Sequence, residues 1–281
     1  MKRFTLGYLF SEKKLGKDEK IFVKICKKKK IDLVMFNILD KTNETELEKK
    51  AKKCDIIYNN SAEDFVYEII KTLEALGKKV VDSSETYYYI EDKWLFYLKC
   101  KEHKIPAPET ILLSENINLA KNEIREFNKW PVVLKRIEGT QGDFVERAKD
   151  LKEAEEIIKR FWGKAEERSP IIAQEFISSP SYRVTLIGDQ IVQTALKENK
   201  GWKSTGVYQK KFKKFPINKK LKNIIKKVKD LSGIKICGID FLEKDGAPLL
   251  LEVNTTPGFD FFENEREKII EKVINFLKKE A

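Results

Sequence analysis

The stretch from residue 236 to residue 258 constrains the fold more than any other part of this chain. It contains two apolar, β-compatible runs, Ile236–Leu242 and Leu249–Val253. Between them stands Lys-Asp-Gly-Ala at 244–247, a sequence that favours a tight turn. Two such runs joined by a short polar turn predict a β-hairpin, and its few solvent-facing positions predict that it lies inside a covered sheet.

Three polar side chains interrupt this apolar hairpin. With the turn centred on Gly246, Asp240 lies opposite Glu252, and Asn254 shares the face of Glu252 because side chains alternate with a period of two. Two facing carboxylates in an apolar sheet repel each other and lose solvation. A Mg²⁺ ion, which prefers carboxylate and other oxygen ligands, would remove both penalties. The alternative is a surface hairpin whose carboxylates lie in water.

The segment Leu-Leu-Glu-Val-Asn-Thr-Thr-Pro-Gly-Phe at 250–259 resembles the metal-binding strand of the ATP-grasp ligases. Within that superfamily it is most similar to the RimK-type glutamate ligases, and the similarity is densest from residue 92 to residue 263. The resemblance implies an α/β ATP-grasp fold. It also implies that two Mg²⁺ ions, or Mn²⁺ in their place, lie on the phosphates of ATP and are held by Asp240, Glu252 and Asn254.

Length and composition limit the classes of protein that this chain can belong to. Its 281 residues suffice for two domains, and a hydrophobic content of 41% is typical of a globular protein. Without an apolar run of eighteen residues the sequence predicts no transmembrane helix, and the run Phe4–Phe10 is too short for a signal peptide. We therefore expect a cytoplasmic protein. Its scattered cysteines predict neither a zinc site nor a disulfide framework.

The chain carries a formal net charge of +11, and such a surface attracts anions. Nucleic acid, an acidic protein, and ATP with an acidic substrate are all compatible with this charge. The aromatic residues lie mostly in apolar strands and helices rather than among basic residues on one face, which argues against nucleic-acid binding. The single histidine, His103, argues against catalysis or metal binding by histidines.

The pattern of strands and helices divides the chain in two. In residues 1–88, strands alternate with helices, which predicts a parallel sheet with right-handed crossovers. No G-x-G-x-x-G follows its first strand, so dinucleotide binding is not expected. The resemblance makes residues 89–281 the ATP-grasp domain, with a mobile lid at about 111–173. Two polar triplets at strand ends, 59–61 and 82–84, are either substrate contacts or turn and cap residues.

A phosphate site is predicted where the apolar strand 131–135 ends in Lys135. The lysine is a point charge, and the glycines in Glu-Gly-Thr-Gln-Gly at 138–142 let backbone N–H groups approach phosphate oxygens. An ordinary hairpin turn would show the same fragment. The fragment resembles the RimK-type lid loop, which implies that Lys135 binds the α and β phosphates. The loop residues implied to close over ATP are Gly139, Thr140, Gln141 and Gly142.

Two further segments resemble nucleotide-binding parts of the family. Asp-Lys-Trp at 92–94 resembles a family motif whose lysine meets the ATP phosphates, which implies that role for Lys93. The apolar strand 171–177 resembles the segment that reads the adenine edge, largely through backbone groups. A buried strand would show the same pattern. The adenine contacts that the resemblance implies are Gln174, Glu175 and Phe176.

Two residues are expected at the reaction centre. Arg183 matches the arginine of the family's Asp-Ile-Arg, and its guanidinium suits a bidentate clamp on a carboxylate or phosphate. The match fails at Ser181, where many members have an acidic residue. Lys203 stands in a loop that in relatives touches the γ-phosphate and the acceptor. Residues 203–209 lack the family's Asn and Arg-Gly-Gly, so the acceptor is the least determined part of the prediction.

Together these features predict an ATP- and Mg²⁺-dependent carboxylate–amine ligase. A substrate carboxylate attacks the γ-phosphorus to give an acylphosphate, and an amine then displaces phosphate. The resemblance implies L-glutamate or another amino acid as the amine. ATP-grasp ligases are often dimers or tetramers, so a homo-oligomer is possible, but the sequence leaves the oligomeric state open. The positive charge favours an acidic acceptor, which is a small molecule, a peptide or a carrier protein. The alternatives are a glutathione-synthetase-like or D-alanine-ligase-like reaction, or an ATP-grasp protein that binds nucleotide without ligating.

Overall fold

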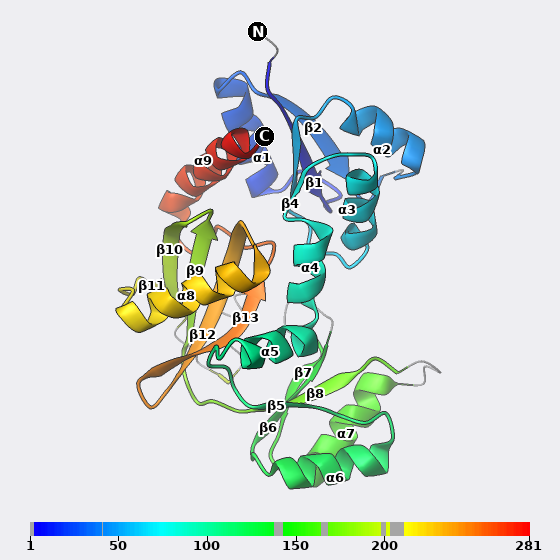
Figure 1. Cartoon of the computed structure of the whole chain (residues 1–281), viewed down its shortest axis with the longest axis vertical. Helices are drawn as coiled ribbons and strands as arrows, with labels where there is room; N and C mark the ends of the chain where they lie inside the picture. Colours follow the sequence, from blue (N-terminus) through cyan, green and yellow to red (C-terminus); the bar gives the residue numbers. More distant parts are fainter. Residues whose placement is uncertain (1–2, 41, 138–142, 164–167, 198–200, 203–210) are drawn as a thin grey trace.

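The computed structural model describes residues 3–40, 42–137, 143–163, 168–197, 201–202 and 211–281. Within these residues the strands form three sheets that follow one another along the long axis of the molecule (Figure 1). The sheet nearest the N-terminus is parallel, and the other two are antiparallel. No helix in the described segments is long and apolar enough to cross a bilayer.

The N-terminal sheet confirms the predicted alternation of strands and helices. Its strands, in the order β2-β1-β3-β4, are β1 (Thr5–Phe10), β2 (Asp32–Asn37), β3 (Ile56–Asn59) and β4 (Val80–Val81). The connecting helices are α1 (Lys17–Lys28), α2 (Glu44–Ala51) and α3 (Val66–Ala75). The final helix, α9 (Glu263–Glu280), returns to this sheet and buries Ile270 and Val273 in one core with Leu6 and Tyr8. The two ends of the chain therefore share a core (Figure 1).

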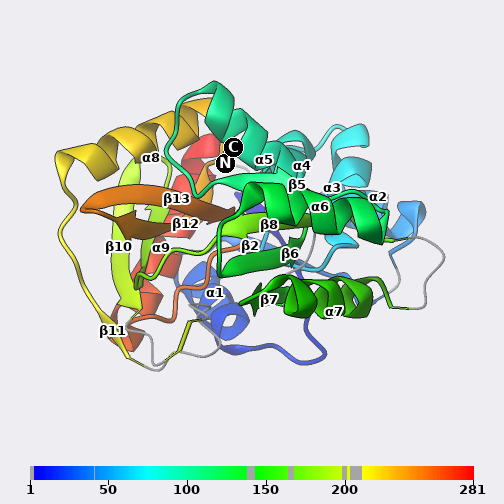
Figure 2. The ribbon, with the colours of Figure 1, turned by 90° about the horizontal axis from the view of Figure 1, so that it is seen from below.

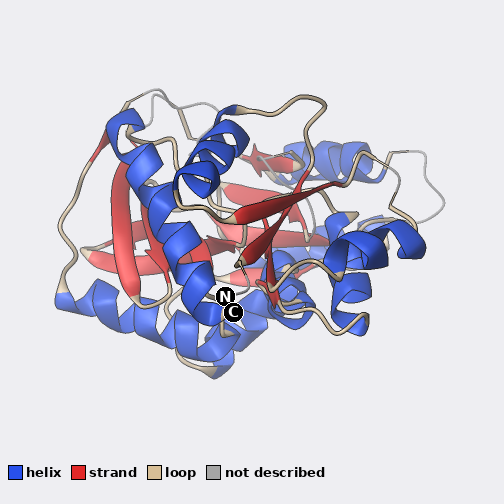
Figure 3. Ribbon diagram, turned by 90° about the horizontal axis from the view of Figure 1, so that it is seen from above, coloured by secondary structure: helices blue, strands red, loops and turns tan. Residues whose placement is uncertain are grey.

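The central sheet contains the predicted hairpin. Its strands, in the order β11-β10-β9-β12-β13, are β9 (Ser181–Ile187), β10 (Gln190–Lys197), β11 (Phe212–Lys213), β12 (Ile236–Lys244) and β13 (Ala247–Asn254). The helices packed on it are α4 (Ser84–Glu91), α5 (Lys93–Glu102) and α8 (Lys219–Ser232). Phe96, Ile224 and Val228 of these helices share a core with Ile239 and Leu250 of the hairpin. Seen from above, helices surround the strands (Figure 3).

The third sheet covers most of the segment that the sequence assigns to a lid. Its strands, in the order β5-β8-β6-β7, are β5 (Thr110–Leu112), β6 (Val132–Arg136), β7 (Val145–Ala148) and β8 (Ile171–Glu175). The helices α6 (Ile117–Phe127) and α7 (Leu151–Trp162) lie in front of it when the molecule is viewed from below (Figure 2). Ile124, Ile158 and Phe161 of these helices pack against Leu134 and Ala173 of the sheet.

The turn of the central hairpin is tighter than the sequence predicted. Lys244 pairs with Ala247, so Asp245 and Gly246 alone form the turn. Their φ angles are 52° and 72°, the left-handed values that a two-residue type I′ turn requires at both positions. Asp and Gly adopt these angles more readily than most residues, which explains their place here.

A β-bulge gives the hairpin its predicted pairing. Phe241 pairs with Leu250, so a regular ladder would place Asp240 opposite Leu251. The register shifts between Asp240 and Phe241, and Asp240 instead pairs with Glu252. The expected facing of the two acidic residues is confirmed. The expected centre of the turn at Gly246 was wrong, because one extra residue on β13 makes up the difference.

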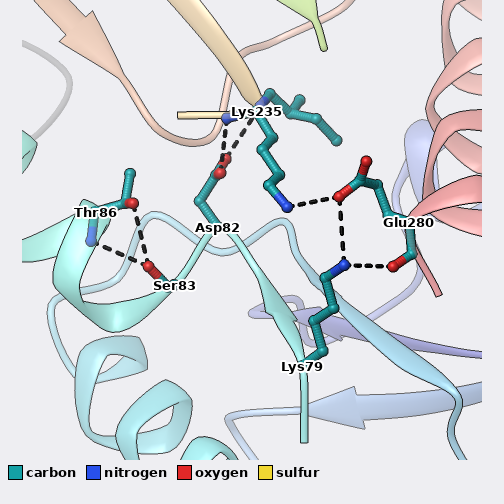
Figure 4. A network of polar contacts seen from close by, with 7 residues as sticks. Lys79, Asp82, Ser83, Thr86, Lys235 and Glu280 are labelled. Atoms are coloured by element: carbon teal, nitrogen blue, oxygen red, sulfur yellow. Dashed lines mark hydrogen bonds and ion pairs between the residues drawn. The ribbon is translucent and has the colours of Figure 1, made fainter. Parts of the chain in front are cut away.

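Asp82 connects the N-terminal sheet to the central hairpin. Its carboxylate follows β4 and accepts hydrogen bonds from the backbone N–H groups of Lys235, at 2.8 Å, and Ile236, at 3.1 Å (Figure 4). The next residue, Ser83, caps α4 by accepting from the N–H of Thr86. Of the two alternatives for residues 82–84, the structure therefore shows a cap at Ser83 and a link between sheets at Asp82.

The same junction includes the C-terminal helix. Glu280 of α9 forms ion pairs with Lys79, just before β4, and with Lys235, just before β12 (Figure 4). Asp82 itself is 7% exposed, and burial raises its pKa to about 6 although the two backbone hydrogen bonds oppose the shift. The junction therefore holds a carboxylate that is protonated at mildly acidic pH.

Lowering the pH towards about 4 should raise the contribution of Asp82 to the free energy of unfolding. Its pKa of about 6 lies above the 3.8 of a free carboxyl, so between these values the folded chain holds the proton more tightly than the unfolded chain. This contribution is complete below about pH 4 and is lost as the pH rises through 6. The stability difference between the wild type and Asp82→Asn should fall by up to about 3 kcal/mol from pH 4 to pH 7. Urea unfolding at both pH values measures it, and a constant difference would contradict the assignment.

Candidate active site

A cavity between the central and third sheets brings four predicted residues together. Lys93 reaches it from α5, Lys135 from β6, Gln174 from β8 and Glu252 from β13. The apolar residues that share the lining include Ile90, Phe96, Ile172, Leu250 and Val253. One cavity thus offers apolar walls, which suit a planar base, beside two ammonium groups, which suit phosphate oxygens.

Lys135 is held in this cavity as a buried cation. Its Nζ donates to Oε1 of Gln174 at 2.7 Å, and Nε2 of Gln174 donates to Thr110 at 3.0 Å. The side chain is 8% exposed. Burial lowers the pKa of Lys135 to about 8, and the nearby Glu252 only partly opposes this. An anion bound next to Lys135 would favour the charged form of the lysine, which burial disfavours.

Lys93 links the start of α5 to the end of β6. Its backbone N–H and its Nζ both contact the carbonyl oxygen of Ile137, at 3.2 and 3.3 Å. The preceding residue, Asp92, caps the helix by accepting from the N–H of Leu95 at 2.8 Å. Residue 137 leads directly into the predicted phosphate loop. That loop, with Gly139, Thr140, Gln141 and Gly142, lies outside the described residues, as does Lys203.

Asp240 lies in a buried cluster with two cations. Arg183 grips it in a fork, with Nε to Oδ1 and Nη2 to Oδ2 both at 2.6 Å. Nζ of Lys197, at the end of β10, lies 3.0 and 3.2 Å from the same two oxygens. Burial alone would raise the pKa of Asp240, but Arg183 and Lys197 together hold it well below its usual range. The sequence predicts that Arg183 clamps a carboxylate or phosphate. In the structure it clamps the carboxylate of Asp240.

Gly238 provides the space for this arginine. A Cβ atom at position 238 would lie 2.3 Å from Nη1 of Arg183, closer than non-bonded atoms approach. The neighbouring strands place Arg183 directly beside Asp240 in the β9–β12 ladder. The sequence Cys-Gly-Ile-Asp therefore carries its glycine where the guanidinium crosses β12.

The three predicted metal ligands provide a donor set that fits a magnesium ion. Asp240 and Glu252 face each other across β12 and β13, and Nδ2 of Asn254 contacts the carbonyl of Gly238 at 3.4 Å. Two carboxylates and one amide oxygen are ligands of the kind that Mg²⁺ prefers. Within the described residues no cluster of three His, Cys, Asp or Glu side chains forms a separate metal site. Arg183 and Lys197 already contact both oxygens of Asp240. Asp240 can therefore bind a magnesium ion only if one of these contacts is given up.

The other predicted adenine contacts lie outside this cavity lining. Of the residues described, the cavity lining includes Gln174 but neither Glu175 nor Phe176. Glu175 forms an ion pair with Lys244 at the hairpin turn. The ring of Phe176 lies 4.8 Å from the guanidinium of Arg147 on β7. Their roles toward adenine stay a prediction.

Two side chains of this region, Lys197 and Glu91, have no clear signal in the sequence. Lys197 ends an apolar strand with a charge, which is a weak signal because strands commonly end in polar residues. Glu91, the last residue of α4, accepts a hydrogen bond from Thr255 at 2.6 Å, just beyond Asn254. Burial raises the pKa of Glu91, and the nearby Glu252 adds to the effect. Only its position beside Asp92 and Lys93 could have drawn attention to it.

Comparison with known proteins shows the family of this chain. The model of the RimK-like ATP-grasp domain matches residues 90–277. The chain belongs to the RimK-like ATP-grasp family. A probable alpha-L-glutamate ligase of Coxiella burnetii is 28% identical to this RimK-like chain over 226 residues, which cover 76% of this chain and 71% of that protein.

Solved structures confirm the ATP-grasp fold beyond the matched segment. A RimK domain ATP-grasp protein from Sphaerobacter thermophilus superposes with a TM-score of 0.77, at 15% identity, over 96% of this chain and 98% of its own. A D-alanine–D-alanine ligase from Bacillus anthracis complexed with ATP gives a TM-score of 0.76, at 15% identity, over 98% of this chain and 96% of its own. The N-terminal sheet of this RimK-like protein is therefore part of a shared architecture.

Proposed function

We propose that this chain is an ATP- and Mg²⁺-dependent carboxylate–amine ligase, which joins L-glutamate or another amino acid to an acidic acceptor through an acylphosphate. The observation that carries the proposal is the convergence of Lys93, Lys135 and Glu252 on one cavity, next to the buried Asp240 and Arg183. Family membership and the 28% identity to a probable alpha-L-glutamate ligase support the reaction class.

In this proposal the apolar part of the cavity takes the adenine, and Lys93 and Lys135 take phosphate oxygens. Asp240, Glu252 and Asn254 hold magnesium, which neutralises phosphate charge when bound. Residues 1–88 form a domain that precedes the ATP-grasp domain, 89–281. Within the latter, residues 111–173 move as a lid over the nucleotide. The chain's own task is to position the reactants and exclude water, which requires no histidine or cysteine.

The reaction can be tested by following ADP and product mass together. The protein is incubated with ATP, Mg²⁺, each of the twenty amino acids or D-alanine, and acidic small molecules, peptides or carrier proteins as acceptors. We expect ADP release that depends on glutamate or another single amino acid, together with an acceptor mass increased by that amino acid minus water. ADP release that depends on D-alanine alone would favour the D-alanine-ligase-like alternative. Nucleotide binding without any product would favour the non-ligating one.

Nucleotide binding should take up a proton at Lys135 under alkaline conditions. With a pKa of about 8, this lysine is largely neutral at pH 9 in the free protein, and a bound phosphate would favour its charged form. We expect an uptake approaching one proton at pH 9 and little at pH 6.5, where the lysine is already charged. Calorimetry in buffers of different ionisation enthalpy measures it. Lys135→Arg, which stays charged, should remove the uptake; an unchanged uptake would assign it to another group.

A further inference from the structure

Three charged side chains are in direct contact in the buried cluster at Asp240. Arg183 and Lys197 contribute two positive charges and Asp240 one negative, and the half-buried Glu252 opposite Asp240 lies close enough to favour the charged form of both cations. The side chains of Asp240 and Lys197 are 3% and 2% exposed. Both cations also lie over the ring of Phe261, at 5.7 and 5.9 Å from its centroid. The cluster is therefore buried, and two cations share one carboxylate in direct contact.

The two cations hold Asp240 with unequal strength. The fork of Arg183 makes two contacts of 2.6 Å, and the space left by Gly238 fits its guanidinium. Lys197 makes longer contacts of 3.0 and 3.2 Å with the same oxygens. An ammonium on a flexible stem is also easier to redirect than a planar fork that is held on two sides. Lys197 is thus the partner that can leave Asp240.

We propose that Lys197, which contacts both oxygens of Asp240, holds a cation position there and exchanges with the metal when the metal–nucleotide binds. This inference rests on the proposed function. In the exchange, Lys197 would turn its ammonium from Asp240 to a phosphate oxygen while Arg183 keeps its two contacts, and Asp240 would then be able to hold a divalent ion. One cation replaces another at the carboxylate, so Asp240 is never left buried without a partner.

The exchange makes metal binding depend on the nucleotide. A divalent ion alone must displace Lys197 into a site with no phosphate to receive it, which is unfavourable for a buried ammonium. The metal–nucleotide supplies that phosphate. Removing the charge at position 197 should therefore strengthen the binding of free metal and weaken the binding of nucleotide. A lysine with a purely structural role would not change these two affinities in opposite directions.

Mn²⁺ binding, followed by electron paramagnetic resonance, tests the exchange without turnover. With the wild type we expect weak Mn²⁺ binding, which a non-hydrolysable ATP analogue tightens at least 100-fold. In Lys197→Met the affinity for Mn²⁺ alone should rise about 10-fold and the effect of the analogue should shrink. Lys197→Arg, which keeps the charge, should resemble the wild type. Lys222→Met, on the exposed face of α8, serves as the matched control.

Mn²⁺ binding by Lys197→Met that is no tighter than that of the wild type would overturn the proposal. If this variant does not fold, Lys197→Gln, which retains a hydrogen-bond donor for Asp240, takes its place, and the same two outcomes support or overturn the exchange. The outcome is separable from that of the proposed function. If the protein shows the exchange but forms no amide, the exchange stands and the ligase assignment is wrong. If the protein forms an amide but Lys197→Met, or Lys197→Gln in its place, binds Mn²⁺ like the wild type, the ligase assignment stands and the exchange is wrong.

Discussion

Replacing Asp240 by asparagine is expected to lower the free energy of unfolding by about 3–5 kcal/mol, the range found when one partner of a buried ion pair is removed. The substitution removes the one carboxylate that contacts both Arg183 and Lys197, and the two residues are 7% and 1% exposed. An amide oxygen can accept one of their hydrogen bonds but cannot offset their charge. Urea denaturation at pH 7, followed by circular dichroism, measures the loss.

The double variant Asp240→Asn with Lys197→Met provides the control for this explanation. It removes one of the two cations left without this carboxylate, so its stability should exceed that of Asp240→Asn alone, and the two substitutions should be strongly non-additive. A single variant that loses less than about 1 kcal/mol, an amount typical of an exposed pair, would contradict the buried cluster. Additive effects of the two substitutions would show that Lys197 does not interact with Asp240.

Replacing Glu252 by glutamine should reduce turnover by about 10²–10³-fold, the usual cost of losing one group that stabilises charge in a transition state. Glu252 lines the cavity with Lys93 and Lys135 and faces Asp240 across the hairpin. Its side chain is only half-buried, so the stability of the fold should change little. The rate of ADP formation with a productive acceptor measures the effect.

Glu243→Gln is the matched control, because Glu243 stands on the same hairpin and is exposed. It should keep wild-type turnover. If Glu252→Gln is as active as this control, the carboxylate at 252 does not take part in the reaction. The proposed placement of the metal would then have to be abandoned, even though the fold and the family would be unaffected.

Local patterns in the sequence were enough to predict the long, periodic elements. The facing of Asp240 and Glu252 was predicted correctly but from a wrong turn centre, and only a β-bulge that the sequence did not indicate produces it. The helices α2 and α4 were missed, and α4 has a run of three tyrosines in place of a clear apolar stripe. The strands β5 and β7 are three and four residues long, too short to show alternation. Propensity is a weak guide for segments of this kind, because their conformation depends on tertiary contacts.

The candidate site was predictable only in part, for a different reason. Lys135 and Glu252 could be found one at a time from local motifs, yet their convergence on one cavity depends on how two sheets pack. Lys197 contacts Asp240 across 43 residues of chain, and no local pattern encodes that contact. Nor did the sequence indicate that two basic side chains, Arg183 and Lys197, form ion pairs with one of the two facing carboxylates, that of Asp240.

The β-bulge in the central hairpin bears on how relatives of this protein can be recognised. The paired acids are brought into line by one supernumerary residue, because the turn alone would align Asp240 with Leu251. A homologue with a straight hairpin would therefore achieve the same facing with its second acid one position earlier in the chain. A search pattern that demands constant spacing between the two acids would reject such a homologue, whereas one that tolerates a single gap there would retain it.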